Sequence, residues 1–182
     1  LLRTSVTPTI AQQRNFDPQI FPRVALLNKL TDNMSLFASV SEGFSPPSLA
    51  EVRPSTGAFS NTLRPERGIN YEAGWRGRLA GILTFDVARY YFRLRDAIVI
   101  QRNAEGAEYF VNAGGTRQNG WEAMLTFSPN MGSSVVSDFD VTMSGAYNQF
   151  KFDDYVQDGN DFSGNKLTGV APGFVAVQAD VR

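Results

Sequence analysis

Polar and apolar residues alternate along most of this chain, and this period of two constrains the fold more than any other feature. Over 71–79 the odd-numbered positions include Tyr71 and Trp75, whereas the even-numbered positions include Glu72 and Arg76. Successive side chains of a strand point to opposite faces, so this pattern predicts strands with one apolar and one polar face. The same alternation recurs over 34–41, 119–127, 139–148 and 175–181. No segment shows a sustained helical period.

The connections between the predicted strands alternate between short and long. We place strands at 22–30, 33–43, 69–79, 82–101, 117–128, 138–152 and 172–182. The connections at 31–33, 80–81 and 129–137 are short, whereas those at 44–68, 102–116 and 153–171 are long and polar. An up-and-down antiparallel barrel has tight turns at one rim and long loops at the other. The sequence therefore predicts an all-β fold of that kind.

The predicted strand 82–101 has a less regular pattern than the others. Arg89 and Arg93 fall on the same side as Phe85 and Val87. An arginine facing lipid at the middle of a bilayer costs about 2–4 kcal/mol. Either the strand shifts its phase at a bulge, or its second half stands above the membrane. Its length favours the second alternative, since about 9–11 residues span a bilayer.

Composition excludes several classes of function. The 182 residues carry 17 Lys and Arg against 18 Asp and Glu, so no basic surface for nucleic acid is expected. Histidine and cysteine are both absent, which removes thiol nucleophiles, histidine bases and Cys/His metal sites. The longest apolar runs, 24–27 and 97–100, are far shorter than the roughly 18 residues of a membrane helix. No membrane-spanning helix is expected.

Five motifs in a fixed order carry a resemblance to a known family. They are Gly43-Phe-Ser-Pro-Pro-Ser-Leu-Ala-Glu51, Leu63-Arg-Pro-Glu-Arg-Gly-Ile-Asn-Tyr-Glu-Ala-Gly-Trp-Arg-Gly77, Tyr90-Tyr-Phe-Arg-Leu-Arg-Asp-Ala-Ile98, Tyr109-Phe-Val-Asn-Ala-Gly-Gly-Thr-Arg-Gln-Asn-Gly-Trp-Glu122 and Gly164-Asn-Lys-Leu. This set resembles the barrel half of TonB-dependent outer-membrane receptors, in particular those for iron complexes. The resemblance covers most of residues 22–182.

The resemblance implies a bacterial outer-membrane protein that imports a scarce nutrient. It implies a transmembrane barrel of 22 strands that is closed by an N-terminal plug. The TonB–ExbB–ExbD complex would act through that plug, and the expected cargo is a ferric siderophore or ferric citrate. No cofactor, catalysis or nucleic acid is expected, and lipid surrounds the barrel. About seven strands and no plug are recognised, so we expect residues 1–182 to be one partial barrel domain of a larger receptor.

The candidate ligand-binding residues lie in the expected outer loops. They are Phe44, Arg53, Arg64, Arg67 and Tyr109. Aromatic faces and guanidinium groups suit the planar or anionic ligands of a ferric siderophore. A purely architectural role is the alternative, since Pro46 and Pro47 rigidify the exit from a strand.

Two further loop features have mainly structural interpretations. Oxygen-bearing side chains gather in one loop, and calcium prefers oxygen ligands, but their spacing does not match a calcium loop. They are Asp153, Asp154, Asp158, Asn160 and Asp161. A solvated loop is therefore expected there. Gly114 and Gly115 are expected to supply a bulge or a positive φ rather than a phosphate-binding loop.

The two faces of the strands give the most specific predictions. Trp75, Trp121, Phe139 and Val141 are expected to face lipid. The polar face is expected to look onto the plug, and its members include Glu72, Arg76, Glu122, Asp140 and Asn148. Two alternatives remain, namely a soluble secreted all-β module and a hydrolase that uses paired carboxylates.

Overall fold

A computed structural model describes residues 18, 20–53, 59–112, 114–130, 139–157 and 159–181 of the chain. The main sheet contains β1 (Arg23–Thr31), β2 (Met34–Ser45), β3 (Glu66–Leu79), β4 (Leu83–Arg95), β7 (Gly115–Phe127), β8 (Phe139–Asp154) and β11 (Gly173–Val181). The other elements are α1 (Leu49–Val52), β5 (Ile98–Arg102), β6 (Glu108–Asn112), β9 (Val156–Gln157) and β10 (Asn160–Asp161). The described residues include no helix that is long and apolar enough to cross a membrane.

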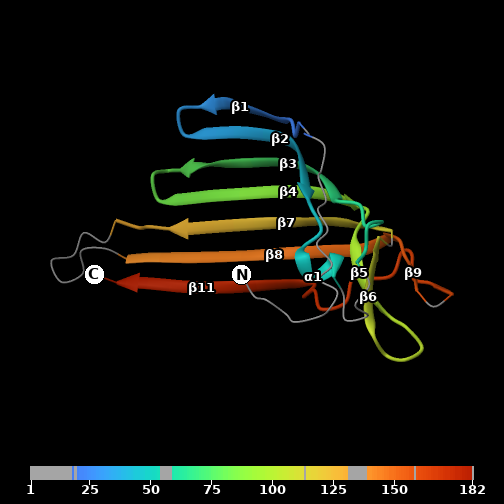
Figure 1. The fold of residues 1–182 in the computed structure, drawn as a ribbon. Coiled ribbons are helices and arrows are strands. Elements are labelled where there is room, and N and C mark those ends of the chain that lie inside the picture. Colours follow the sequence, from blue (N-terminus) through green and yellow to red (C-terminus); the bar gives the residue numbers. More distant parts are fainter. Residues whose placement is uncertain are drawn as a thin grey trace, which may run out of the picture.

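The seven long strands form one antiparallel sheet in the order β1-β2-β3-β4-β7-β8-β11 (Figure 1). Each of these seven strands pairs with the next long strand along the chain. The small hairpins inserted in the loops form separate two-stranded sheets. The turns β1–β2 and β3–β4 are tight, and the long connections gather at the opposite end with α1, β5, β6 and β9. The predicted all-β class and the sorting of loops are therefore confirmed.

The predicted strand 82–101 is too long, and the structure shows why. β4 ends at Arg95, and Asp96 adopts a positive φ of 56° that turns the chain out of the sheet. The pairing of β4 with β3 and β7 continues without a register shift, so the alternative of a bulge is wrong. Arg89 consequently stays on the apolar face, where its guanidinium lies 5.4 Å from the centre of the Trp121 ring.

The β5–β6 hairpin and the helix α1 in the long connections were not predicted. The region 102–116 was expected to be a polar loop. Instead, β5, which begins before this region, pairs with β6, which lies within it, and the two form a separate two-stranded sheet. The four-residue helix α1 follows Ser48 in a capping box. There the Glu51 carboxylate accepts from the backbone N–H of Ser48, and the Ser48 hydroxyl accepts from that of Glu51. Both elements make the loop end a structured region.

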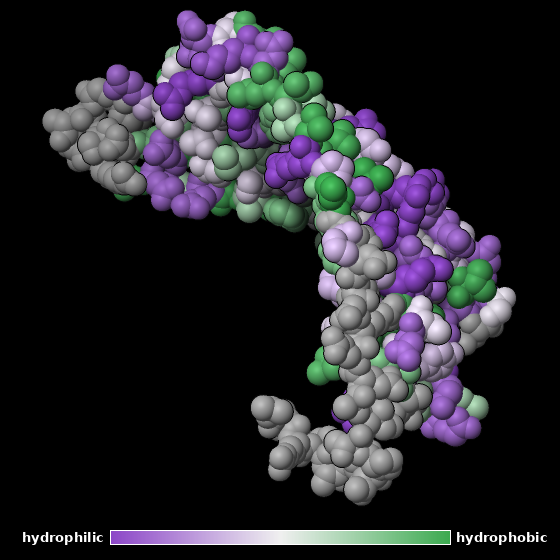
Figure 2. All heavy atoms as spheres, turned by 45° about the horizontal axis from the view of Figure 1, so that its top comes forward, coloured by the Kyte–Doolittle hydropathy of each residue, from purple (hydrophilic) through white to green (hydrophobic). Residues whose placement is uncertain are grey.

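The register of the sheet separates an apolar face from a polar one. Trp75 lies opposite Val87 and Val87 opposite Ala123, while Trp121 lies opposite Tyr147. Phe139 and Val141 share this face by alternation along β8, so the predicted grouping of Trp75, Trp121, Phe139 and Val141 is confirmed. Both tryptophans are exposed, at 43% and 48%. Figure 2 shows hydrophilic residues over the long-loop end on its right and also at its upper left.

The sheet has open edges and little buried core. Every residue of β1 and of β11 is exposed, and these two strands form the edges of the sheet. Among the described residues, the buried apolar side chains are Val52, Leu63, Phe85, Ala97 and Tyr155. Of these, only Phe85 belongs to the main sheet. The remaining four stabilise the loop end.

Gly114 connects the small hairpin to the main sheet at a very close crossing. Its φ is +75°, and the sheet register shifts next to it, between Gly115 and Thr116. A Cβ atom at Gly114 would lie 1.0 Å from the backbone oxygen of Asp154. Only glycine fits here, so the predicted positive φ and bulge at residues 114 and 115 are confirmed.

Candidate functional site

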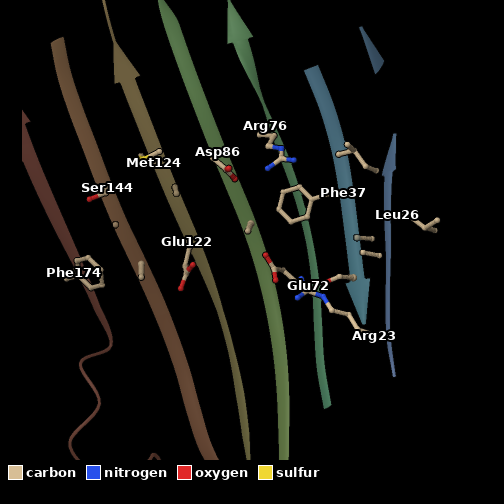
Figure 3. Close-up of a pocket in the computed structure, with 18 residues that line it drawn as sticks. Arg23, Leu26, Phe37, Glu72, Arg76, Asp86, Glu122, Met124, Ser144 and Phe174 are labelled. Atoms are coloured by element: carbon tan, nitrogen blue, oxygen red, sulfur yellow. The ribbon is translucent and has the colours of Figure 1, made fainter. Parts of the chain in front are cut away.

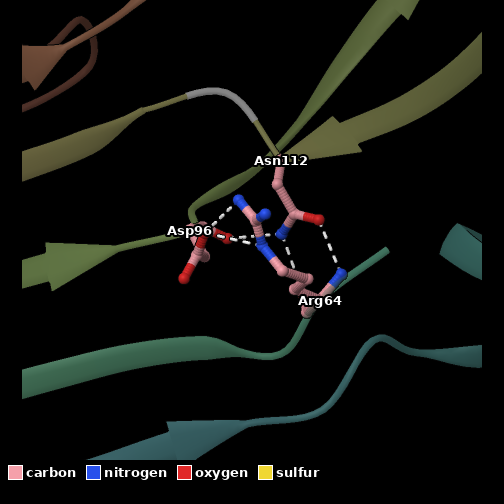
Figure 4. Close-up of polar contacts among 3 residues, drawn as sticks. All are labelled: Arg64, Asp96 and Asn112. Carbon is pink, nitrogen blue, oxygen red and sulfur yellow. Dashed lines mark hydrogen bonds and ion pairs between the residues drawn. The ribbon is translucent and has the colours of Figure 1, made fainter. Parts of the chain in front are cut away.

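One polar network ties the long connections together at the loop end (Figure 4). The Asn112 side chain accepts from the backbone N–H of Arg64 (2.6 Å) and donates to the carbonyl oxygens of Arg64 (2.8 Å) and Asp96 (2.7 Å). The Nε of Arg64 donates to Oδ1 of Asp96 at 3.0 Å. The network therefore joins the segment before β3 to the end of β4 and the end of β6.

Two of the predicted ligand-binding residues take part in contacts within this end. The Arg64 guanidinium forms an ion pair with Asp96, although its side chain remains 69% exposed. The Tyr109 hydroxyl donates to Oε1 of Gln101 across the β5–β6 hairpin at 2.8 Å. Both side chains thus hold the loops in place, and either retains surface that a ligand can reach.

The other three predicted residues lie at the same end but take no part in these contacts. Arg53 caps the C-terminus of α1 with its backbone N–H, which donates to the carbonyl oxygen of Leu49 at 3.0 Å. Phe44 and Arg67 are direct cross-strand partners and lie on the apolar face of the sheet, where Phe44 stacks on Phe21. The five residues share one end of the molecule, but they do not converge on a single pocket. Their role in binding stays a prediction.

The acidic loop is organised by hydrogen bonds and ion pairs. Asp153 binds two arginines, and the carboxylate of Asp161 accepts from the backbone N–H of Ser163 at 2.8 Å. Hydrogen bonds from the hydroxyl and the backbone N–H of Ser163 lower the pKa of Asp161. Asp158 lies outside the described residues. The part of the chain that the structure describes contains no cluster of three acidic residues suited to a metal ion.

The polar face of the sheet lines an open hollow of about 780 Å³ that extends from β1 to β11 (Figure 3). Its charged lining residues are Arg23, Glu72, Arg76, Asp86 and Glu122. Arg76 and Asp86 are cross-strand partners and point into the same space in Figure 3. The predicted polar character of this face, drawn from Glu72, Arg76 and Glu122, is confirmed.

One feature of the hollow depends on two strands and was not predicted from the sequence. The Phe37 ring lies beneath the guanidinium of Arg76, which is 5.4 Å from the ring centre. Phe37 is opposite Gly74 in the register, and a Cβ atom at Gly74 would lie 2.3 Å from that ring. On this face of β2, Phe37 stands among serines, and this exception in the sequence was the signal that the position is special. Because Gly74 has no side chain, the Phe37 ring fits over it, and the guanidinium of Arg76 lies against that ring.

Nearer the loop end, the same face carries a chain of hydrogen bonds. The Tyr90 hydroxyl donates to Oδ1 of Asn148 at 2.8 Å, and Nδ2 of Asn148 donates to the carbonyl oxygen of Ala171 at 3.1 Å. The Tyr90 ring also packs edge-on against Phe150, with centroids 6.3 Å apart. This chain fixes the connection before β11 to the inner surface of the sheet.

Taken together, the polar face offers mixed charges and hydrogen-bonding groups over a broad, shallow surface. With three carboxylates and two guanidinium groups, it suits contact with a polar protein surface better than capture of one small ion. The opposite face is apolar and aromatic. A sheet with these two faces and with long loops at one end has the anatomy of a wall between hydrocarbon and a polar interior.

Comparison with known proteins identifies one family. The model of the TonB dependent receptor-like β-barrel matches residues 3–178. No curated protein sequence matched the chain.

Several solved structures share the fold. The ferric yersiniabactin uptake receptor FyuA from Yersinia pestis is 18% identical, with a TM-score of 0.61, over 88% of this chain and 22% of that one. The siderophore receptor PirA from Acinetobacter baumannii is 19% identical, with a TM-score of 0.56, over 79% and 24%. The copper transporter OprC is 17% identical, with a TM-score of 0.57, over 72% and 20%. The chain thus spans about a fifth to a quarter of the length of these proteins.

Proposed function

This chain belongs to the TonB-dependent receptors of the bacterial outer membrane, and on that premise we propose that it forms part of the wall of an importer for a metal chelate. The single observation that supports transport is the pairing of an apolar outer face with a charged inner face over seven strands. Such a sheet separates lipid from a polar interior and needs no chemistry of its own. Members of the family are transport receptors rather than enzymes.

We propose a ferric siderophore or ferric citrate as the cargo. The family likeness and the names of the similar structures support a metal-containing cargo, since they describe a ferric yersiniabactin receptor, a siderophore receptor and a copper transporter. Exposed arginines at the loop end, such as Arg53 and Arg64, suit an anionic chelate. The loops decide the cargo, because they carry the contacts that differ between receptors.

The inner face supplies the proposed contact with the rest of the receptor. Glu72, Asp86 and Glu122, with Arg23 and Arg76, line the hollow and would face a plug domain. Energy from the TonB–ExbB–ExbD complex would then act on the plug, while this wall stays fixed. Mixed charges on the wall allow the plug to be held by several weak polar contacts that can be exchanged as it moves.

Uptake of labelled iron tests this proposal. The intact receptor that contains this chain is expressed in a strain without its own ferric-chelate receptors, and ⁵⁵Fe uptake is measured with ferric citrate and with ferric siderophores. Uptake of at least one chelate is expected, and it should disappear when TonB is deleted. Uptake that continues without TonB would refute energised transport. Failure with all iron chelates, together with TonB-dependent copper uptake, would refute only the iron cargo.

A pair of variants tests the predicted loop residues. Arg53→Ala should weaken binding of an anionic ferric chelate several-fold, because it removes an exposed cation from the loop end. Arg78→Ala is the matched control, since Arg78 lies at the short-turn end of β3. Equal affinity of both variants and the unmodified receptor, measured by equilibrium binding to whole cells, would remove Arg53 from the binding site.

A further inference from the structure

The connection before β11 bulges away from β8 between two hydrogen-bonded positions. At one end of the bulge, the backbone N–H of Asn148 donates to the carbonyl oxygen of Pro172 at 2.8 Å. At the other end, the backbone N–H of Leu167 donates to the carbonyl oxygen of Phe150 at 3.0 Å. Between these bonds β8 has one residue, whereas the connection has four, 168–171. Such extra residues lie outside the ladder, so the backbone alone does not fix their position.

A side chain of β8 supplies a further contact to this bulge. Nδ2 of Asn148 donates to the carbonyl oxygen of Ala171 at 3.1 Å. Asn148 therefore binds the connection twice, with its backbone at Pro172 and with its side chain at the last residue of the bulge. A side-chain amide binds a carbonyl only through its nitrogen, because its oxygen is an acceptor. The contact with Ala171 thus depends on which way the Asn148 amide is turned.

The hydroxyl of Tyr90 determines the orientation of this amide. It donates to Oδ1 of Asn148 at 2.8 Å, so the amide oxygen faces Tyr90 and the amide nitrogen faces Ala171. A flipped amide would place its oxygen against the carbonyl oxygen of Ala171, and two acceptors cannot share a hydrogen bond. Tyr90 therefore acts on the connection through Asn148.

The sheet makes room for this contact across an intervening strand. Tyr90 lies opposite Gly120, and Gly120 lies opposite Asn148. A Cβ atom at Gly120 would lie 2.5 Å from the Tyr90 hydroxyl oxygen, so a side chain there would displace the hydroxyl. The Tyr90 ring also packs edge-on against Phe150, with centroids 6.3 Å apart. β4, β7 and β8 thus each contribute one residue to a row that permits this hydrogen bond.

We propose that Tyr90 is a positioning residue in uptake: through the Asn148 amide, its hydroxyl holds the connection before β11 in the place from which the mouth captures cargo. A connection that is already held in one position loses less conformational entropy when a ligand binds against it. The part of this inference that concerns uptake rests on the proposed function. The part that concerns the position of the connection does not, so the two can fail separately.

Amide hydrogen exchange in the purified intact receptor tests the position of the connection. Tyr90→Phe removes the hydroxyl and keeps the ring against Phe150. Exchange at the backbone amide of Asn148, which reports release of Pro172, should accelerate about fivefold, the usual effect of losing one hydrogen bond. Tyr91→Phe is the matched control, since it removes a hydroxyl from the next residue, on the opposite face, and should leave this rate unchanged. An unchanged rate in Tyr90→Phe would overturn the proposal.

A cycle of single and double variants tests whether Tyr90 acts through Asn148. Asn148→Ala removes the amide and should accelerate exchange at position 148, relative to the intrinsic rate of each residue, by more than Tyr90→Phe does. Adding Tyr90→Phe to Asn148→Ala should produce no further change, because the hydroxyl then has no amide to orient. Heat-modifiable migration on gels confirms that each variant is folded. Additive effects would show that the two side chains act independently and would overturn the proposal.

Uptake kinetics test the role of the connection in capture. In Tyr90→Phe, the ferric chelate concentration that gives half-maximal ⁵⁵Fe uptake should rise roughly two- to fivefold, with an unchanged maximal rate. Tyr91→Phe should match the unmodified receptor in both values.

The other outcomes separate this inference from the proposed function. A structural defect would lower the maximal rate with the number of folded receptors. That result, or an unchanged half-saturation concentration, would refute the role of Tyr90 in uptake. If the unmodified receptor takes up no ferric chelate, the proposed cargo fails, and exchange at the amide of Asn148 still decides whether Tyr90 positions the connection.

Discussion

The main sheet and the loop end of this molecule are stabilised in different ways. The sheet has a continuous register over seven strands, but only one of its apolar side chains is buried within the described residues. The loop end has short elements, yet it contains the other buried apolar side chains and the network of Arg64, Asp96 and Asn112. The sheet depends on surroundings that differ between its faces, whereas the loop end depends on specific contacts within the chain.

The largest loss of stability is expected at Gly114, where the loop end meets the main sheet. Gly114→Ala places a Cβ atom against the backbone oxygen of Asp154 and forces a side chain into a positive φ. Strain and overpacking together should reduce the free energy of unfolding by about 3–5 kcal/mol. Gly106→Ala is the matched control, since Gly106 has a φ of +82° but open space around it. Denaturant unfolding of the reconstituted receptor should separate the two variants, and equal losses would contradict the close crossing.

The two faces of the sheet can be compared at adjacent positions of β4. Val87→Arg places a charge on the apolar face and should cost about 2–4 kcal/mol of unfolding free energy in a bilayer. Ala88→Arg places the same charge on the polar face, which already holds Asp86 and Glu122, and should cost less than about 1 kcal/mol. The measurement is unfolding from lipid vesicles. If both variants lose the same free energy, the assignment of the faces is wrong.

The polar network of the loop end should give a local effect. Asn112→Ala removes three hydrogen bonds that join separate connections, which should cost about 1–3 kcal/mol. Amide hydrogen exchange should accelerate in β5 and β6, while the main sheet remains protected. Asn119→Ala, which removes one longer bond of 3.3 Å to the carbonyl oxygen of Gln149, is the control. Faster exchange throughout the sheet would show that the two regions are not independent.

The smallest effect concerns the helix cap. Ser48→Ala removes the hydroxyl that accepts from the N–H of Glu51 and should destabilise α1 by about 1 kcal/mol. Exchange of the amide of Glu51 should increase several-fold. Ser60→Ala, in the same connection but outside the helix, should leave this amide unchanged. No change in the Ser48 variant would mean that the packing of Val52 alone holds the helix.

The comparison also explains which features could be predicted from sequence. Alternation is a local signal, so it was enough to predict the strands, the sorting of loops and the face of Trp75 and Trp121. The end of β4 at Arg95 depends on a turn at Asp96 and on an ion pair with Arg64, which is 32 residues away. Alternation alone carries no information about such a contact.

Other features that were not predicted do have signals in the sequence. The spacing of Ser48 and Glu51 is that of a capping box. The β-branched residues of 98–100 and the aromatic residues of 109–110 favour paired strands. The hollow needed the register between strands, because its members are neighbours only across the sheet. The predicted ligand-binding residues remain untested.

The network of Arg64, Asp96 and Asn112 makes two long connections mechanically dependent on each other. Asn112 is hydrogen-bonded to Arg64, 48 residues away, so the same bonds hold the β5–β6 hairpin and the segment that leads into β3. Displacing either of them breaks bonds that belong to both. A molecule bound against one connection would therefore also change the free energy needed to displace the other.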